Sequence, residues 1–211
     1  MAFIRKVYAI LAIQLVITAS AIFAVQYSES ARDYATNSPG LAITCCIVSI
    51  ATMCMIICCF GRKAPLNYIL LLLFTGCEAY MVAGLTAQYD RHTVLMAGTT
   101  TALVTVSLTI YAMTTKTDIS VFMAAVFVLY LAMMPMMMLS IFCWNIPGMY
   151  IFYNVIGLIF YSLYLIIDTI MICKSAEMQK KHGYSMITYD DYIIGALQLY
   201  LDIVMIFVYL L

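Results

Sequence analysis

The feature that most constrains this chain is a succession of apolar segments, each about twenty residues long. Of the 211 residues, 66% are hydrophobic and only 9% are charged, whereas soluble domains are about a quarter charged. An α-helix rises ~1.5 Å per residue, so about 20 residues cross the ~30 Å hydrocarbon core of a bilayer. In lipid each segment must satisfy its own backbone hydrogen bonds. The chain is therefore predicted to be an all-α polytopic membrane protein embedded in the lipid bilayer.

Seven candidate transmembrane helices follow one another with short joints and form a single transmembrane domain over residues 1–211. The joints contain the turn residues expected there, such as Asn37-Ser38-Pro39-Gly40. The first apolar run is expected to be a retained helix, because no small-residue cleavage site of a signal peptide follows it. The predicted spans cover residues 7–27, 41–60, 66–88, 93–113, 119–142, 149–173 and 192–211.

The Lys and Arg residues indicate the orientation of the chain in the membrane. If the N-terminus is cytosolic, the opposite side holds only Arg32 and Arg91, and this positive-inside bias predicts a cytosolic N-terminus. Seven spans then place the C-terminus on the opposite side, whereas an even count with one re-entrant segment returns it to the cytosol. The basic residues of the cytosolic side are Arg5, Lys6, Arg62, Lys63, Lys116, Lys174, Lys180 and Lys181.

Several classes of function are disfavoured by what the sequence lacks. The net charge is zero and no basic run occurs, so no nucleic-acid partner is expected. There is no set of metal-binding His and Glu, no nucleophile–base pair and no Gly-rich phosphate loop, so neither an enzyme nor a bound cofactor is expected. A receptor or retinal protein is disfavoured by the cytosolic N-terminus and by a last span without Lys. The eight Cys indicate no disulfide framework.

Three acidic residues, Glu78, Asp168 and Asp202, stand inside predicted spans and not at their edges. A carboxylate in the hydrocarbon core costs a few kcal/mol or more unless it is compensated, so such a residue marks a functional site by default. The alternative is a protonated carboxyl that only packs within the helix bundle. Glu78 lies about 18 Å from the cytosolic edge, Asp202 about 15 Å and Asp168 about 8 Å. If the helix of Asp168 continues beyond Lys174, the three carboxyls could meet in one layer.

Polar residues extend the same helix faces. Asp191, Gly195, Gln198 and Asp202 recur at helical spacing along the last span and predict a polar stripe that ends at its midpoint. A second face of this kind belongs to the sixth span. It is formed by Asn154, Gly157, Tyr161, Tyr164 and Asp168.

The acidic residues predict a cation-conducting or proton-sensitive site. Two carboxyls close together cannot both ionise cheaply, so Asp168 and Asp202 are expected to share a proton and to respond to pH. Their hard oxygens suit H⁺ or transient Ca²⁺, which would be a permeant ion and not a cofactor. In this hypothesis Glu78 completes the gate. The path would be lined by Asp191, Gly195, Gln198, Tyr161 and Tyr164.

Five groups of motifs spread over nearly the whole chain support a more specific interpretation. Together and in this order they resemble the Bax inhibitor motif (TMBIM) family, closest to its Golgi anti-apoptotic and lifeguard branches, which have cellular and viral members. The groups are FIRKVYAIL at residues 3–11 with Gln14, Leu15 and Thr18; PLNY at 65–68 with FTGCE at 74–78; LTIY at 108–111 with KTD at 116–118; IIDT at 166–169; and LYLDI at 199–203 with Phe207.

The resemblance implies seven helices with the C-terminal helix at the centre of the bundle. It also implies a Ca²⁺ leak from Golgi or endoplasmic reticulum stores that inhibits apoptosis. In the family, the acids matching Asp168 and Asp202 form a hydrogen-bonded pair that gates Ca²⁺ with pH, and Glu78 matches a recurring acid. The chain departs from the family pattern at Ile167 and Met205, where Tyr and Asn are frequent. No deep Arg is present to latch the acids.

A second hypothesis uses the same sequence differently. The protein would be a membrane adaptor that does not conduct ions and suppresses cell death by binding Bcl-2-type proteins or Ca²⁺-release channels. The buried acids would then serve only to hold the helices together.

Overall fold

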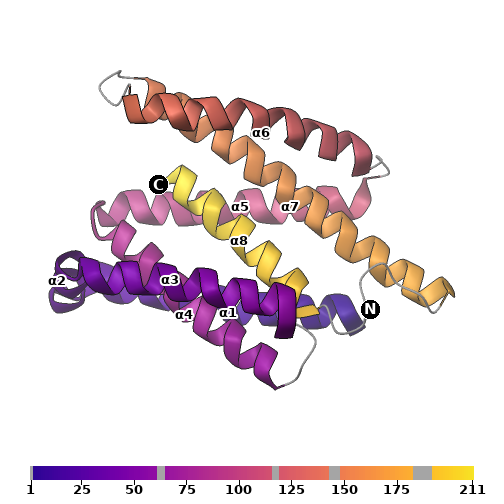
Figure 1. Ribbon diagram of the computed structural model, residues 1–211, viewed down its shortest axis with the longest axis horizontal. Coiled ribbons are helices and arrows are strands. Elements are labelled where there is room, and N and C mark those ends of the chain that lie inside the picture. Colours follow the sequence, from indigo (N-terminus) through magenta and orange to yellow (C-terminus); the bar gives the residue numbers. More distant parts are fainter. Residues whose placement is uncertain (1, 61–64, 116–118, 143–147, 183–191) are drawn as a thin grey trace. The chain divides into compact units, whose positions relative to one another are not determined.

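The computed structural model describes residues 2–60, 65–115, 119–142, 148–182 and 192–211, and it describes the side chains of these residues except 2, 60, 132, 134–142, 149–150 and 175–182. The described chain is helical almost throughout and contains no strand, which confirms the all-α prediction (Figure 1). Its elements are α1 (Ala2–Tyr27), α2 (Glu29–Asn37), α3 (Pro39–Met55), the π-helix η1 (Ile56–Phe60), α4 (Leu66–Thr86), α5 (Arg91–Thr114), α6 (Ile119–Phe142), α7 (Met149–His182) and α8 (Tyr192–Leu210).

Six of the predicted spans are confirmed as helices that are long and apolar enough to cross a membrane. The seventh, α6, is helical, but its described apolar part is the shorter segment Ile119–Leu131. A count of seven spans therefore stays a prediction. The six confirmed segments are Phe3–Tyr27, Pro39–Cys59, Leu66–Thr86, Arg91–Thr114, Ile151–Lys174 and Tyr192–Leu210.

Two helical features differ from the simplest sequence prediction. The short helix α2 fills what was predicted to be a joint, and it begins where the Ser28 side chain accepts a hydrogen bond from the Ala31 backbone N–H. Arg32 of α2 then donates two hydrogen bonds to the Ala87 carbonyl just after α4. These bonds satisfy a carbonyl that the end of α4 leaves without a helical partner.

The helix of Asp168 does continue beyond Lys174, which was only a condition in the sequence prediction, because α7 runs to His182. Asp168 is fourteen residues from that end, about 21 Å along the helix axis. The carboxyl therefore lies well inside a continuous helix and not near its terminus.

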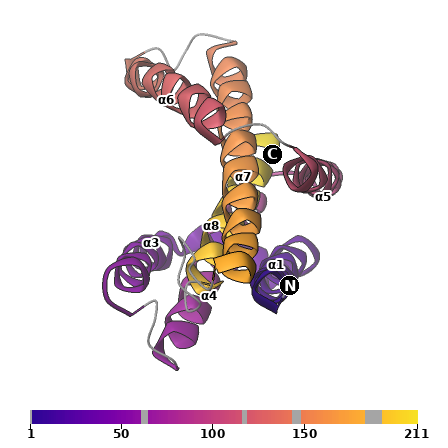
Figure 2. The same cartoon turned by 90° about the vertical axis from the view of Figure 1, so that its right-hand side faces the viewer.

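The helices group into two compact units, each of which is described by itself. Unit 1 contains Met1–Leu95 and Lys174–Tyr200, and unit 2 contains Met96–Cys173 and Leu201–Leu211. In unit 1, α4 packs against both α1 and α3 (Figure 1). In unit 2, α7 and the end of α8 lie side by side in both views (Figures 1 and 2).

Small residues allow close packing in unit 1. Ala83 and Ala87 pack against Val25 of α1, with Ala31 and Ala35 of α2 partly covering them. In lipid no hydrophobic force drives helices together, so close van der Waals contact at small residues takes its place. This explains why α4, rich in buried small residues, is the central helix of the unit.

Hydrogen bonds join the helices of unit 1 across its core. The Gln14 side chain on α1 donates to Thr75 Oγ1 on α4 at 2.9 Å. Thr18 Oγ1 donates to the Gln14 carbonyl and lies 2.8 Å from Tyr200 Oη of α8. Because the Thr18 proton is used by that carbonyl, Tyr200 is the donor to Thr18. These bonds connect α1, α4 and the first half of α8.

The core of unit 2 is formed by α5, α6 and α7. Ile166 and Ile170 of α7 pack on Ala112 of α5. Ile167 and Phe160, also of α7, pack on Val126 of α6. Asp168 belongs to the same turns of α7 as these apolar residues, which explains how the helix holds a carboxyl in a buried position.

We expect Thr18→Val to lower the free energy of unfolding by roughly 0.6–1.7 kcal/mol, from the mean to the largest value measured for hydrogen bonds between the helices of a membrane protein. The substitution keeps the shape of the side chain but leaves the buried Tyr200 hydroxyl without its acceptor. Denaturant unfolding of the purified protein in detergent micelles measures the change.

Ser20→Ala is the matched control, because the exposed Ser20 hydroxyl bonds to the Val16 carbonyl of its own helix. A loss of the same size in both variants would show that the bond between α1 and α8 contributes nothing specific.

Candidate ion site

The carboxyls of Asp168 on α7 and Asp202 on α8 are hydrogen-bonded to one another. Both residues are buried, with 6% and 5% of their surface exposed. Ile167 and Thr169 flank Asp168, Ile203 follows Asp202, and all three are buried as well. The structure therefore brings together the two acids that the sequence singled out, although 34 positions separate them in the chain.

A carboxyl–carboxyl hydrogen bond has a chemical requirement. A carboxylate has no donor, so one proton must lie between the two groups. Within the described residues no Lys or Arg interacts with Asp168 or Asp202, and each acid has the other as its charged neighbour. Asp202 Oδ2 is buried and has no hydrogen-bond partner in the described part of the chain. The pair thus combines a hydrogen bond that requires a protonated carboxyl with an acceptor oxygen that has no partner among the described residues.

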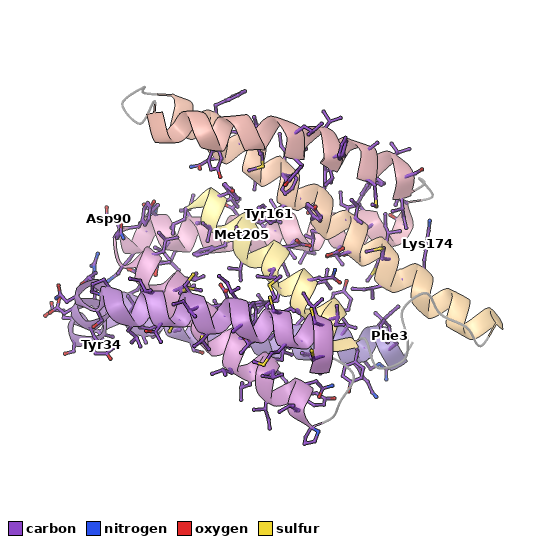
Figure 3. The ribbon with its side chains drawn as sticks, viewed as in Figure 1. Phe3, Tyr34, Asp90, Tyr161, Lys174 and Met205 are labelled. Atoms are coloured by element: carbon purple, nitrogen blue, oxygen red, sulfur yellow. The ribbon has the colours of Figure 1, made fainter. Side chains whose placement is uncertain are left out.

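Tyr161 and Tyr164 of α7 lie beside this pair. Tyr161 interacts electrostatically with Asp202, and Tyr164 does so with both Asp168 and Asp202. The two rings are 6.4 Å apart between centroids and each also contacts Phe160. Figure 3 marks Tyr161 on α7 and Met205 on α8, one turn beyond Asp202. Sequence reasoning selected both tyrosines, and the structure places both near the carboxyls.

Glu78 occupies a different environment, in unit 1. Its carboxylate on α4 accepts a hydrogen bond of 2.5 Å from Ser49 Oγ on α3. Since Asp168 and Asp202 belong to unit 2, the predicted layer of three acids stays a prediction. Sequence reasoning missed Ser49, which the structure shows to be buried on α3 together with Thr52.

The predicted polar stripe on α8 is described only in part. Gly195 is buried, Gln198 is exposed and Asp202 is buried, whereas Asp191 lies outside the described residues. Gly195 and Gln198 belong to unit 1. Their role as one wall of a path to Asp202 stays a prediction.

The donor set suits a passing cation better than a closed metal site. No group of three or more His, Cys, Asp or Glu side chains converges anywhere in the described parts of the chain. Ca²⁺ takes six to eight oxygen ligands, so two carboxyls and neighbouring phenols would hold it only together with water. Such incomplete coordination permits transient binding, as ion passage requires.

Sequence reasoning also missed Tyr153 of α7 and Tyr209 of α8. Tyr209 contacts the rings of both Tyr153 and Tyr161, with centroid separations of 5.9 Å and 5.7 Å. An aromatic residue near the end of an apolar span resembles an ordinary membrane anchor. Only the pairing of α7 with α8 reveals that these tyrosines continue the cluster beside the acids.

Comparison with known proteins gives one consistent result. The family model described as "Bax1-I: Inhibitor of apoptosis-promoting Bax1" matches residues 1–211. Similar curated proteins include "Protein lifeguard 3" of Homo sapiens, 30% identical over 99% of this chain and 67% of its own length, and the Mus musculus protein of the same name, 32% identical with the same coverage. The "Golgi anti-apoptotic protein" of Vaccinia virus (strain Lister) is 28% identical over the whole chain and 84% of its own length.

If the two carboxyls share a proton, both contribute to one protonated-carboxyl band in the infrared spectrum. We expect the protonated-carboxyl band that disappears in Asp202→Asn to disappear also in Asp168→Asn, because the proton is held by the pair and not by one residue. Difference infrared spectra of the purified protein at a series of pH values measure this band.

Glu78→Gln serves as the control, because Glu78 bonds to Ser49 and its loss should leave the band of the pair in place. If a band lost in Asp202→Asn persists in Asp168→Asn, the proton belongs to Asp202 alone.

Proposed function

Because this chain belongs to the Bax1-I family, inhibitors of apoptosis-promoting Bax1, we propose that it is an anti-apoptotic membrane protein that acts as a pH-sensitive Ca²⁺ leak channel. In this proposal it lowers the Ca²⁺ content of the Golgi or endoplasmic reticulum, and less Ca²⁺ is then released to promote cell death. The name of the Vaccinia virus relative, "Golgi anti-apoptotic protein", supports the Golgi as the first compartment to test.

The observation that carries the proposal is the buried Asp168–Asp202 pair, which no Lys or Arg of the described residues neutralises. Here Asp202 Oδ2 keeps a free acceptor position inside the protein. An acidic oxygen without a partner at this depth is the feature expected of an ion or proton site.

The proposed gate depends on competition between H⁺ and Ca²⁺ for the same oxygens. With the proton in place, the hydrogen bond holds α7 and α8 together at this level. Without it, two negative carboxylates repel each other and attract a hard divalent cation. Loss of the proton and binding of Ca²⁺ both change the pair, so we infer that pH and Ca²⁺ act on a single site.

Other polar residues are proposed to take part in ion passage. Tyr161 and Tyr164 offer phenol oxygens next to the carboxyls, where a partly hydrated cation could exchange ligands. In unit 1, Glu78 with Ser49 offers a second acidic position. Glu78 is treated separately from the pair, since it has a hydrogen-bond partner of its own.

The orientation proposed is the one with a cytosolic N-terminus. At one end of unit 1, Lys6 lies 5.3 Å from the Tyr192 ring centroid, and Tyr192 bonds to Tyr68. The other end holds Arg32 beside Ala87, and Arg91 lies over the Tyr27 ring. The N-terminal Arg5 and Lys6 belong to the end that the excess of basic residues assigns to the cytosol.

Selective permeabilisation of cells tests both orientation and compartment. An epitope tag before Phe3 should stain when only the plasma membrane is permeable, because a cytosolic N-terminus is then exposed. The stain should coincide with Golgi or endoplasmic reticulum markers. A tag in the joint that follows Ala87 should stain only after internal membranes are also permeabilised, and the opposite pattern would reverse the proposed orientation.

Ca²⁺ flux from proteoliposomes tests the gate. For Asp202→Asn and Asp168→Asn we expect the ratio of leak rates in acidic and alkaline buffer to fall to about one, because the amide N–H can donate to the remaining carboxyl at any pH and the bond between α7 and α8 no longer depends on a shared proton. The parent protein should keep a ratio that differs clearly from one. Asp33→Asn is the matched control, since Asp33 is an exposed carboxyl on α2.

Two outcomes would contradict the proposal. If both Asn variants leak like the parent at every pH, the acid pair is not the gate. If purified protein carries no flux, yet cells are protected from apoptosis by the protein with both acids neutralised, the adaptor hypothesis with Bcl-2-type or Ca²⁺-release-channel partners is favoured.

A further inference from the structure

A column of aromatic rings extends from the carboxyl pair along the contact between α7 and α8. It begins with Tyr164 and Tyr161 beside the acids and continues through Tyr209 to Tyr153. Successive ring centroids are 6.4, 5.7 and 5.9 Å apart, which is within the range of ring contact. All four rings belong to unit 2.

The column leads from the acids toward the C-terminal end of α8. Tyr161 precedes Asp168 by seven residues and Tyr209 follows Asp202 by seven, about 10 Å along each helix. Since Asp168 meets Asp202 and Tyr161 meets Tyr209, the two helices run in opposite directions and both displacements point the same way. Tyr209 therefore lies between the acids and this end of the helix pair.

The ring of Tyr209 packs unusually closely against α7 at Gly157. A Cβ added to the buried Gly157 would lie 2.7 Å from Tyr209 Cδ1 and closer still to its Cε1 and Cζ, well inside the ~3.5–4.0 Å of a normal carbon contact. The ring thus rests directly on the backbone of α7 where no side chain intervenes. A Cβ added to the helical Gly76 or Gly98 would instead meet no atom within 4 Å.

The contacts of Tyr209 indicate that its ring matters more than its hydroxyl. Its Oη lies 3.5 Å from Tyr153 Oη, longer than the 2.5–3.0 Å of a good O–H···O bond. No tyrosine hydroxyl donates to Asp202 Oδ2, which has no partner among the described residues. A chain of hydroxyls that conducts protons would need both of these bonds. The column is better suited to fill space than to relay protons.

We propose that Tyr209, seated on Gly157, is the barrier that closes the approach to the Asp168–Asp202 pair from the C-terminal end of α8. The proposal rests on the proposed function, because a barrier is needed only if ions reach the pair. Gly157 acts here as a positioning residue. It provides the depression into which the ring fits, and displacement of the ring opens the approach while the helices stay in place.

The test compares Ca²⁺ leak from proteoliposomes for three substitutions. Gly157→Ala pushes the ring off its seat and Tyr209→Ala removes it, so both should raise the leak roughly tenfold, which a small change in barrier height is enough to produce. Tyr209→Phe keeps the ring and should leak like the parent. Gly98→Ala is the matched control, a helical glycine of unit 2 with open space around its added methyl.

A double variant separates the barrier from a merely structural effect. If Gly157 acts through Tyr209, Gly157→Ala with Tyr209→Ala leaks no faster than Tyr209→Ala alone, because the two changes are not additive. If the increase in leak rate of the double variant equals the product of the two single increases, Gly157 disturbs the bundle independently of Tyr209. That outcome would overturn its assigned role.

The remaining outcomes distinguish this barrier from the channel itself. A parent protein that leaks with the expected pH dependence, while Tyr209→Ala and Gly157→Ala leak at the same rate, overturns the barrier and leaves the proposed function intact. An increase in Tyr209→Phe equal to that in Tyr209→Ala would assign the effect to the hydroxyl and overturn a barrier made by the ring. Absence of flux in every variant, Tyr209→Ala included, overturns both.

Discussion

Lipid offers no hydrogen-bond partner, so the polar groups inside these helices depend on partners within the protein. Thr18 meets Tyr200, Gln14 meets Thr75 and Ser49 meets Glu78, so each polar residue fixes which helix lies beside which. The Asp168–Asp202 bond obeys the same constraint with an added condition, because it exists only while one proton is shared. We propose that this condition makes the contact between α7 and α8 at this level sensitive to pH, unlike the hydroxyl and amide bonds of unit 1.

The two units differ in the polar groups that connect their helices. In unit 1 the interhelical polar groups have donors and acceptors that do not depend on pH, apart from Glu78, and small residues such as Ala83 bring the helices close. In unit 2, Asp168 lies in a helix otherwise packed by Ile166, Ile167 and Ile170, and it meets Asp202 of α8. An apolar setting of this kind strengthens any electrostatic change at the pair. The proposed leak and its proposed barrier both depend on this contrast between a pH-independent scaffold and a responsive helix pair.

Much of the fold followed from composition and spacing. Apolar runs of about twenty residues specify helices, because no other open structure satisfies its backbone in lipid. The helical continuation of α7 past Lys174 followed from good helix-forming residues. The short helix α2 was missed, since its nine residues are too few for a periodic signal and it depends on a cap at Ser28 and on Arg32 binding the Ala87 carbonyl. Ser49 was missed because one serine in an apolar span resembles any small residue.

The sequence by itself determined the membrane class, the positions of the helices and the acids that stand inside them, because hydrophobicity and helical period act locally along the chain. Only the tertiary structure decided that Asp168 meets Asp202, that Glu78 meets Ser49 and that Tyr209 rests on Gly157. Periodicity assigns a residue to a face of its own helix, but not to the helix which that face contacts. Which helices pair depends on side-chain packing and polar contacts between segments distant in the chain, and in lipid those contacts are the main forces that select a partner.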